Sequence, residues 1–184
     1  MSGSEGGTMT PITGQTPEAG SPESAATEQP AALAGRRALL VGSSGGHLAQ
    51  LMPLAPLWES ADRRWVMFDT PDARSRLSAE QVTWAFSPTT RNIPNLLRNM
   101  WLAVSVISSW RPDVVVSTGA GVALPFFVVA HLRRIPTVYV EVYDRVDSRT
   151  LTGRLCRPFT STFCVQWPEQ QALYRGSRVV GPLL

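Results

Sequence analysis

Three short segments join glycine, hydroxyl and charged side chains to the ends of apolar, β-branched runs. The first runs from Gly42 to His47 and follows the apolar run that ends at Val41. Glycines let a backbone turn tightly and approach a ligand closely, and the free amides at a helix start favour negative charge. The segment therefore predicts a binding site for an anion such as a diphosphate. Its candidate binding residues are Ser43, Ser44, Gly45 and Gly46.

A dinucleotide site is an alternative interpretation of the same segment. The dinucleotide fingerprint G-x-G-x-x-G needs glycine at positions that Ser44 and His47 occupy here. Asp69 does lie at the spacing of a ribose-binding acid. An independent nucleotide-binding protein of another class is therefore the interpretation that we favour less.

The second segment, Ser117 to Gly121, also lies between an apolar run and a helix-compatible stretch. Thr118, Gly119 and Gly121 are candidates for the opposite wall of the anion site. The alternative is structural, because small residues are also needed where a helix packs closely on a strand.

The third segment gathers four charged residues at the end of another predicted strand: Glu141, Asp144, Arg145 and Asp147. Such a cluster is costly unless its members bind a ligand or pair with one another. Asp144 and Arg145 are candidate acceptor-binding residues, and a salt-bridge network around Arg145 is the alternative.

Strands and helices are expected to alternate from Arg36 onward, which is typical of βαβ units around a parallel sheet. We predict an α/β, Rossmann-like fold, in which ligands bind in loops at the carboxyl ends of the strands. The expected strands are Arg37 to Val41, Trp65 to Phe68, Val82 to Phe86, Val114 to Ser117, Thr137 to Glu141, Thr162 to Gln166 and a short one near Val179. The expected helices are His47 to Trp58, one after Thr70 with Pro71 at its first position, Ile93 to Trp110, Val122 to Arg133 and Arg149 to Arg157.

Length and composition predict one globular domain after a disordered tail. Residues 1–35 lack aromatic side chains, are rich in Pro, Gly, Ser and Thr, and carry only acidic charge, so they cannot support a core. Residues 36–184 form the predicted domain, where 17 basic against 10 acidic residues give a net charge of +7. All 17 are arginine, the better bidentate ligand for phosphate, although genome composition is the simpler explanation.

The chain is expected to be cytoplasmic. The tail has neither the basic start nor the apolar stretch of a signal peptide, and no apolar run reaches the roughly 18–20 residues that cross a bilayer. Cys156 and Cys164 match no metal-ligand spacing, so packing is their expected role.

The stretch from Ile93 to Trp110 carries an apolar stripe that has two interpretations. It either packs on the sheet, as the helix between two parallel strands usually does, or lies in a membrane interface. The stripe consists of Ile93, Leu96, Leu97, Met100, Trp101, Val104 and Ile107.

Several of these motifs together resemble a known family. The segments Leu40 to Leu51, Arg111 to Pro125 and Tyr139 to Trp167, with the closing Val180 to Leu184, are similar to bacterial polysaccharide-biosynthesis proteins. Those proteins are related to the membrane-recruiting subunit of the eukaryotic dolichol-linked N-acetylglucosaminyltransferase. A more distant similarity joins the Gly-Gly-His loop to the peptidoglycan transferase that makes lipid II.

The resemblance implies the N-terminal, acceptor-facing half of a GT-B glycosyltransferase whose other half is a separate chain. That donor-side subunit would carry the site for the nucleotide-sugar, a UDP-sugar, and the acceptor would be a polyprenyl-diphosphate-linked saccharide of exopolysaccharide or capsule synthesis. Attachment at the inner face of the plasma membrane is expected, with no cofactor, no metal and no nucleic-acid partner. A metal-dependent GT-A mechanism is disfavoured because no D-x-D spacing occurs.

Transfer to a sugar hydroxyl, with inversion expected, needs a general base. His47 is the first candidate, since imidazole titrates near ~6.5, and Glu141 is the second. His47 has a structural alternative, in which it caps its helix or bonds a backbone carbonyl. The chain as a whole has a functional alternative: a non-catalytic recruiter that brings a self-sufficient donor subunit to the membrane.

Overall fold

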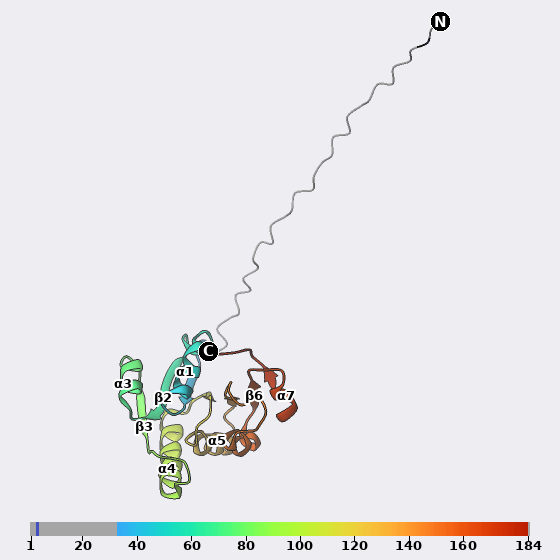
Figure 1. The fold of residues 1–184 in the computed structure, drawn as a ribbon. Coiled ribbons are helices and arrows are strands. Elements are labelled where there is room, and N and C mark those ends of the chain that lie inside the picture. Colours follow the sequence, from blue (N-terminus) through green and yellow to red (C-terminus); the bar gives the residue numbers. More distant parts are fainter. Residues whose placement is uncertain (1–2, 4–32, 184) are drawn as a thin grey trace.

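Seven parallel strands form one sheet in the order β3-β2-β1-β4-β5-β6-β7 (Figure 1). The computed structural model describes Gly3 and residues 33–183. The predicted α/β, Rossmann-like sheet is confirmed, and each predicted strand is found within three residues of its expected bounds. The strands are β1 (Arg37–Val41), β2 (Asp62–Phe68), β3 (Val82–Ala85), β4 (Val114–Ser117), β5 (Thr137–Val140), β6 (Thr162–Val165) and β7 (Arg178–Val179).

Helices cover both faces of this sheet. The α-helices are α1 (Gly46–Leu51), α2 (Ala55–Trp58), α3 (Pro71–Arg76), α4 (Ile93–Trp110), α5 (Ala123–Leu132), α6 (Leu151–Cys156) and α7 (Gln170–Leu173). Two 3-10 turns, η1 (Met52–Leu54) and η2 (Arg157–Phe159), extend α1 and α6.

The side chains of each inner strand alternate between two cores. On β1, Leu39 and Val41 point into a core that α4, α5 and α6 cover, whereas Ala38 and Leu40 point into one that α1, α2 and α3 cover. All four are fully buried. Burial on both faces explains why the sequences of the strands are continuous apolar runs.

The strand order creates a crevice between β1 and β4. The chain winds from β1 outward to β3 on one side, then returns and winds from β4 outward to β7 on the other. The connections therefore diverge where β1 and β4 lie side by side, and ligands bind at such a point. Register pairs Val41 with Ser117, so the first two candidate loops leave the sheet next to each other.

The predicted helix from His47 to Trp58 is wrong as a single element. Proline has no N–H to donate and its ring obstructs the preceding turn. Pro53 and Pro56 accordingly divide the stretch into α1, η1 and α2. The short helix α7 was not predicted.

Of the two interpretations of the α4 stripe, packing on the sheet is wrong for most of the stripe. Ile93 is 69% exposed, Leu97 58% and Trp101 76%, and Val104 is exposed as well. The inward side of the helix shares Ile107 with the stripe, and its other residues were not part of the predicted stripe. That side carries Asn95, Asn99, Ala103, Ile107 and Trp110.

Two buried asparagines explain this orientation of α4. Asn99 accepts a hydrogen bond from the Phe86 amide and donates one to the Phe86 carbonyl, each at 2.9 Å. Asn95 donates to the Pro88 carbonyl at 2.9 Å. Because these amides satisfy backbone groups beyond the end of β3, they fix the loop from Phe86 to Asn92 against the helix.

The predicted disordered tail falls mostly on residues outside those that the structure describes. Leu33, which lies within its predicted bounds, is buried in the core beside α1 and α2, and the Gly35 amide donates to the Ser60 carbonyl. Within residues 33–183, no helix has the length and apolarity needed to cross a bilayer.

Replacement of Asn99 tests the bond pair that orients α4. Asn99→Leu keeps the branched shape of the side chain but leaves two backbone groups of Phe86 without partners, so we expect a loss of about 1–3 kcal/mol in the free energy of unfolding. Urea denaturation measures it. Ser105→Leu places the same side chain on an exposed position of α4 and should change stability by less than about 0.5 kcal/mol. Equal losses in the two variants would contradict the role of the asparagine.

Candidate active site

A polar cavity of about 280 Å³ opens at the carboxyl ends of β1, β4 and β5. It lies beside the crevice that the strand order creates, and residues from several segments far apart in the chain contribute to it. Its lining residues are His47, Ala120, Tyr139, Glu141, Val142, Asp144, Arg145, Thr150 and Thr152.

His47 and Thr118 hold the first two loops together by a pair of hydrogen bonds. His47 Nδ1 lies 2.9 Å from the Thr118 carbonyl oxygen, and Thr118 Oγ1 donates to the His47 carbonyl at 2.7 Å. A carbonyl oxygen can only accept, so Nδ1 must carry the proton in the neutral ring. Nε2 is then left with a lone pair and has no protein hydrogen-bond partner among the described residues.

The environment of His47 keeps the ring neutral. Burial lowers the pKa of His47 below its ordinary value of 6.5, and this outweighs the opposite effects of the Thr118 carbonyl and the Asp144 charge. A neutral imidazole with a free Nε2 can accept a proton. Of the two structural roles considered for His47, the bond to a backbone carbonyl is found and the helix cap is not.

Glu141 lies deeper in the cavity wall than His47 and is 0% exposed. Its carboxylate accepts hydrogen bonds from Thr150 Oγ1 and from the Val142 amide, each at 3.0 Å. Burial is the largest effect on this carboxyl group and raises the pKa of Glu141 above its usual 4.5. Thr150 also accepts from the Gly153 amide, so Glu141 anchors the start of α6.

Gly153 is required for this arrangement. A Cβ atom at position 153 would lie against the Glu141 carboxylate, 2.7 Å from Tyr174 Oη and 2.8 Å from Thr150 Oγ1. The helix can approach Glu141 this closely only because residue 153 has no side chain.

A buried glutamine holds the loop that carries Asp144 and Arg145. Gln170 Nε2 donates to the Val142 carbonyl at 2.8 Å and to the Arg145 carbonyl at 3.1 Å. Gln170 is fully buried, so these bonds are shielded from water. The loop is thereby fixed through its backbone, and the Asp144 and Arg145 side chains remain exposed at the cavity.

A second glutamine connects the site to both ends of the folded chain. Gln166 Nε2 donates to Gln50 Oε1 of α1 at 2.7 Å and to the Glu141 carbonyl at 2.9 Å. Gln166 Oε1 accepts from the Leu183 amide at 2.9 Å. The C-terminal segment consequently returns toward α1 (Figure 1).

The glycines after β4 are needed for close contacts. A Cβ atom on Gly119 would lie 2.9 Å from the His47 ring and 3.1 Å from Tyr139 Oη, and the residue has a φ of 115°. A Cβ atom on Gly121 would lie 2.7 Å from Thr89 Oγ1. Small residues are therefore required at both positions, but for contacts with His47, Tyr139 and Thr89 and not for the helix-on-strand packing of the structural alternative.

The predicted site residues divide into four groups. His47, Glu141, Asp144 and Arg145 line the cavity, whereas Thr118 and Gly119 lie beside it and hold His47. Gly121 lines a neighbouring groove. Ser43, Ser44, Gly45 and Gly46 do not line the cavity, although they immediately precede His47.

One alternative for the third segment is wrong. Arg145 makes no ion pair with any residue that the structure describes, so no salt-bridge network surrounds it. Asp69, the candidate ribose-binding acid, is paired with Arg74 at 2.5 Å. Sequence reasoning missed Tyr139, Thr150 and Thr152, which form much of the cavity wall. Thr150 could have been found as the expected cap of the helix that follows it.

An apolar groove of about 630 Å³ adjoins the polar cavity, and Thr152 lines both. Its walls come from the loop before α4, from α4 itself, from the start of α5 and from α6. Ile93 and Leu151 are each 69% exposed there. The other lining residues are Thr89, Thr90, Arg91, Asn92, Leu96, Gly121, Leu124 and Leu155.

The family of the chain follows from a match to a family model over residues 83–183, described as "Oligosaccharide biosynthesis protein Alg14 like". The matched region includes β4, the Glu141 loop and α6. The chain belongs to the Alg14-like family. The predicted relationship to this family is confirmed. The matched residues 83–183 include every residue that lines the cavity except His47.

Relatives of the Alg14-like chain are transferases of N-acetylglucosamine. It is 27% identical over 180 residues to the UDP-N-acetylglucosamine transferase subunit ALG14 of Mus musculus, covering 80% of this chain and 83% of that one. It is 29% identical over 155 residues to the UDP-N-acetylglucosamine–N-acetylmuramyl-(pentapeptide) pyrophosphoryl-undecaprenol N-acetylglucosamine transferase of Syntrophotalea carbinolica. That alignment covers 76% of this chain but only 42% of the relative. The chain is therefore a glycosyltransferase subunit, as predicted.

Among solved structures, MurG of Acinetobacter baumannii superposes with a TM-score of 0.63 at 16% identity. The match covers 79% of this chain and 45% of MurG. This likeness concerns the fold, and it confirms the predicted equivalence to one half of a GT-B glycosyltransferase.

Gly119→Ala tests the contact that places His47. The new methyl group meets the His47 ring and has to adopt a positive φ, so we expect a loss of about 2–4 kcal/mol in the free energy of unfolding. Chemical denaturation measures the loss. Gly46→Ala is the matched control, because a Cβ atom there meets nothing within 4 Å, and it should be neutral or stabilising by less than about 1 kcal/mol. A Gly119→Ala variant as stable as wild type would show that the ring is placed otherwise.

Proposed function

We propose that the chain is the acceptor-binding, catalytic subunit of a two-chain transferase that moves a sugar from a UDP-sugar to a polyprenyl-diphosphate-linked saccharide. A donor-side subunit supplies the nucleotide-sugar site. The observation that carries the proposal is the junction of a polar cavity containing His47 with an apolar groove, joined at Thr152. An acceptor with a sugar, a diphosphate and a lipid chain needs these two environments next to each other.

The cavity suits the sugar of the acceptor better than its diphosphate. Glu141 and Asp144 line it with carboxyl groups, and Arg145 is its single cationic side chain. Carboxylates and hydroxyls accept hydrogen bonds from sugar hydroxyls but repel phosphate. We therefore assign the sugar to the cavity, and the lipid to the groove.

The diphosphate lies, in this proposal, at the edge of the cavity. The amides of Ser43 to Gly46 precede His47 in the chain, and Arg145 lies in the cavity wall. Arg91 lines the adjoining groove. Arginine forks and exposed amides are the groups that bind phosphate oxygens.

His47 acts in this mechanism as the general base. Its free Nε2 removes the proton of the acceptor hydroxyl while the hydroxyl oxygen attacks the anomeric carbon and displaces UDP, which inverts the configuration. The Thr118 carbonyl stabilises the imidazolium that forms, because Nδ1–H already points at it. Glu141, whose oxygens already accept bonds from Thr150 and Val142, acts as a positioning residue.

Membrane attachment at the cytoplasmic face is part of the proposal. The exposed Ile93 and Leu151 line the apolar groove, and Leu97 and Trp101 are exposed further along α4. Apolar side chains with arginines at their border are suited to the boundary between lipid tails and headgroups. A lipid acceptor could then enter the groove directly from the bilayer.

The polymer that we propose as the product is an exopolysaccharide or capsule.

The second candidate function is a recruiter that brings a self-sufficient donor subunit to the membrane. The exposed face of α4 is compatible with it. The two proposals are separated by assaying transfer from UDP-N-acetylglucosamine to a polyprenyl-diphosphate-linked sugar, with a donor-subunit homologue alone and together with this chain. The same assay is repeated with a soluble acceptor, and transfer to that acceptor by the homologue alone would favour the recruiter.

His47→Asn tests the base. The Asn amide can replace Nδ1 as a donor to Thr118 but has no group at the position of Nε2, so we expect kcat of the two-chain enzyme to fall by roughly 100-fold or more. The chain has a second histidine, His131, and His131→Asn should leave kcat unchanged. Activity of the His47→Asn enzyme equal to wild type would remove His47 from the mechanism.

The pH dependence of kcat/KM checks the same role. A base must be deprotonated, and burial lowers the pKa of His47 below 6.5, so activity should fall only when the pH drops below a midpoint that lies under 6.5. The residual activity of the His47→Asn enzyme should lack this acidic limb. A wild-type midpoint above 6.5 would contradict the assignment.

Leu97→Ser tests membrane attachment. Removal of an exposed apolar side chain from α4 should weaken binding to lipid vesicles by about fivefold to tenfold, in proportion to the apolar area lost. Vesicle sedimentation measures it. Leu132→Ser, at a position that is 74% exposed on α5, is the control and should bind as wild type does. Equal losses would mean that α4 does not form the contact.

A further inference from the structure

Four arginines line a second hollow, of about 350 Å³, between α6 and α7. They are Arg149, Arg154, Arg157 and Arg175, and Leu173 and Tyr174 complete the wall. The hollow shares no lining residue with the polar cavity. Tyr174 connects the two, since its hydroxyl accepts a hydrogen bond from the Thr150 amide at the cavity wall.

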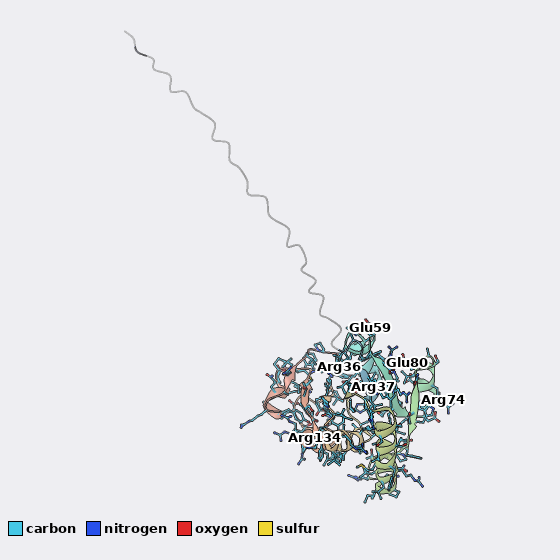
Figure 2. All side chains as sticks on the ribbon, turned by 180° about the vertical axis from the view of Figure 1, so that it is seen from behind. Arg36, Arg37, Glu59, Arg74, Glu80 and Arg134 are labelled. Carbon is cyan, nitrogen blue, oxygen red and sulfur yellow. The ribbon has the colours of Figure 1, made fainter. Side chains whose placement is uncertain are left out.

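None of these four arginines forms an ion pair with a residue in the described part of the chain. Other arginines do have carboxylate partners: Arg37 pairs with Asp113, Arg63 with Glu80, Arg74 with Asp69 and Arg76 with Asp72. Arg74 and Glu80 lie on the β3 side of the molecule (Figure 2), whereas α7 lies at the opposite side of the sheet (Figure 1). Guanidinium groups stay charged at all physiological pH values, so the four repel one another unless an anion joins them.

Two of the four guanidinium groups are held in place by the protein. Arg157 donates to the Arg175 carbonyl at 2.8 Å, and its guanidinium carbon lies 5.2 Å from the centre of the Phe163 ring. Arg149 lies 5.8 Å from the centre of the Tyr174 ring. Preorganised arginines lose less conformational freedom when they bind a ligand.

The other two guanidinium groups are free to bind. Arg154 and Arg175 are exposed, and their side chains make no hydrogen bond to any residue between 33 and 183. No carboxyl group lines the hollow, in contrast to the cavity, where Glu141 and Asp144 do. The hollow is therefore the more favourable of the two for a multiply charged anion.

We propose that this hollow, the arginine hollow, is a binding site for a phosphate group. Planar guanidinium forks match phosphate oxygens in bidentate geometry. The phosphate belongs either to an anionic lipid headgroup or to a soluble phosphate compound. The site is independent of the function proposed for the cavity, because it uses none of the residues assigned to the acceptor or to catalysis.

Arginine-selective modification by phenylglyoxal, read by mass spectrometry, tests the site residue by residue. The full chain is treated alone, with inorganic pyrophosphate, with phosphatidylglycerol vesicles and with phosphatidylcholine vesicles, at one ionic strength set with sodium chloride. We expect protection of Arg154 and Arg175 but not of Arg36, an exposed arginine directly before β1 (Figure 2). Protection by pyrophosphate supports a soluble ligand, and protection by phosphatidylglycerol vesicles alone supports a lipid headgroup. No protection by either, or equal protection of Arg36, would overturn the proposal.

Arg154→Gln provides the second measurement. It removes one unpartnered guanidinium group from the hollow, so affinity for the protecting probe should fall roughly tenfold, as expected for one charge-assisted contact. Arg36→Gln removes the same charge elsewhere and should bind as wild type does. Equal affinities of the two variants would contradict the site, whereas loss of transfer activity in the cavity variants bears only on the function proposed above.

Discussion

The reciprocal hydrogen bonds between His47 and Thr118 are the contact on which the candidate site depends. They join the loop after β1 to the loop after β4 at the place where the strand order reverses. The same contact fixes which ring nitrogen carries the proton and leaves Nε2 without a hydrogen-bond partner among the described residues, on a side chain that lines the cavity. Gly119 makes it possible, because a side chain there would occupy the space of the ring. One pair of bonds thus determines the position and the tautomer of the group to which we assign proton transfer, and burial keeps that group neutral.

The sheet and its loops could be predicted from the sequence because each inner strand is buried on both faces. An uninterrupted run such as Val114 to Ser117 is a strong signal, and its carboxyl end necessarily leads to the ligand-binding edge. From this edge the sequence predicted that the segments Gly42 to His47 and Ser117 to Gly121 form one site, whereas the strand order and register that place them side by side come from the structure. For the same reason Glu141, Asp144 and Arg145 were found from their place after β5.

Features that depend on side-chain contacts between distant segments could not be predicted. The stripe on α4 suggested one inward face, but Asn95 and Asn99 form bonds to the Phe86 loop that turn another face inward. Tyr139 and Thr150 reach the cavity because α6 packs on Glu141, and that packing depends on the missing side chain of Gly153. The sequence shows the polar character of these residues but not the partners that give them a role.

The Gln166 amide group contacts three separate parts of the chain: α1 through Gln50, the end of β5 through the Glu141 carbonyl, and Leu183. Both walls of the site are therefore anchored to neighbouring strands of one sheet, with a buried amide between them. Within residues 33–183 no hinge separates the two walls of the site, so we expect the walls to keep their relative positions. Any opening and closing of the site during turnover would then have to take place between this chain and the proposed donor-side subunit. The rate at which substrates and products exchange would depend on the motion of the two chains relative to each other.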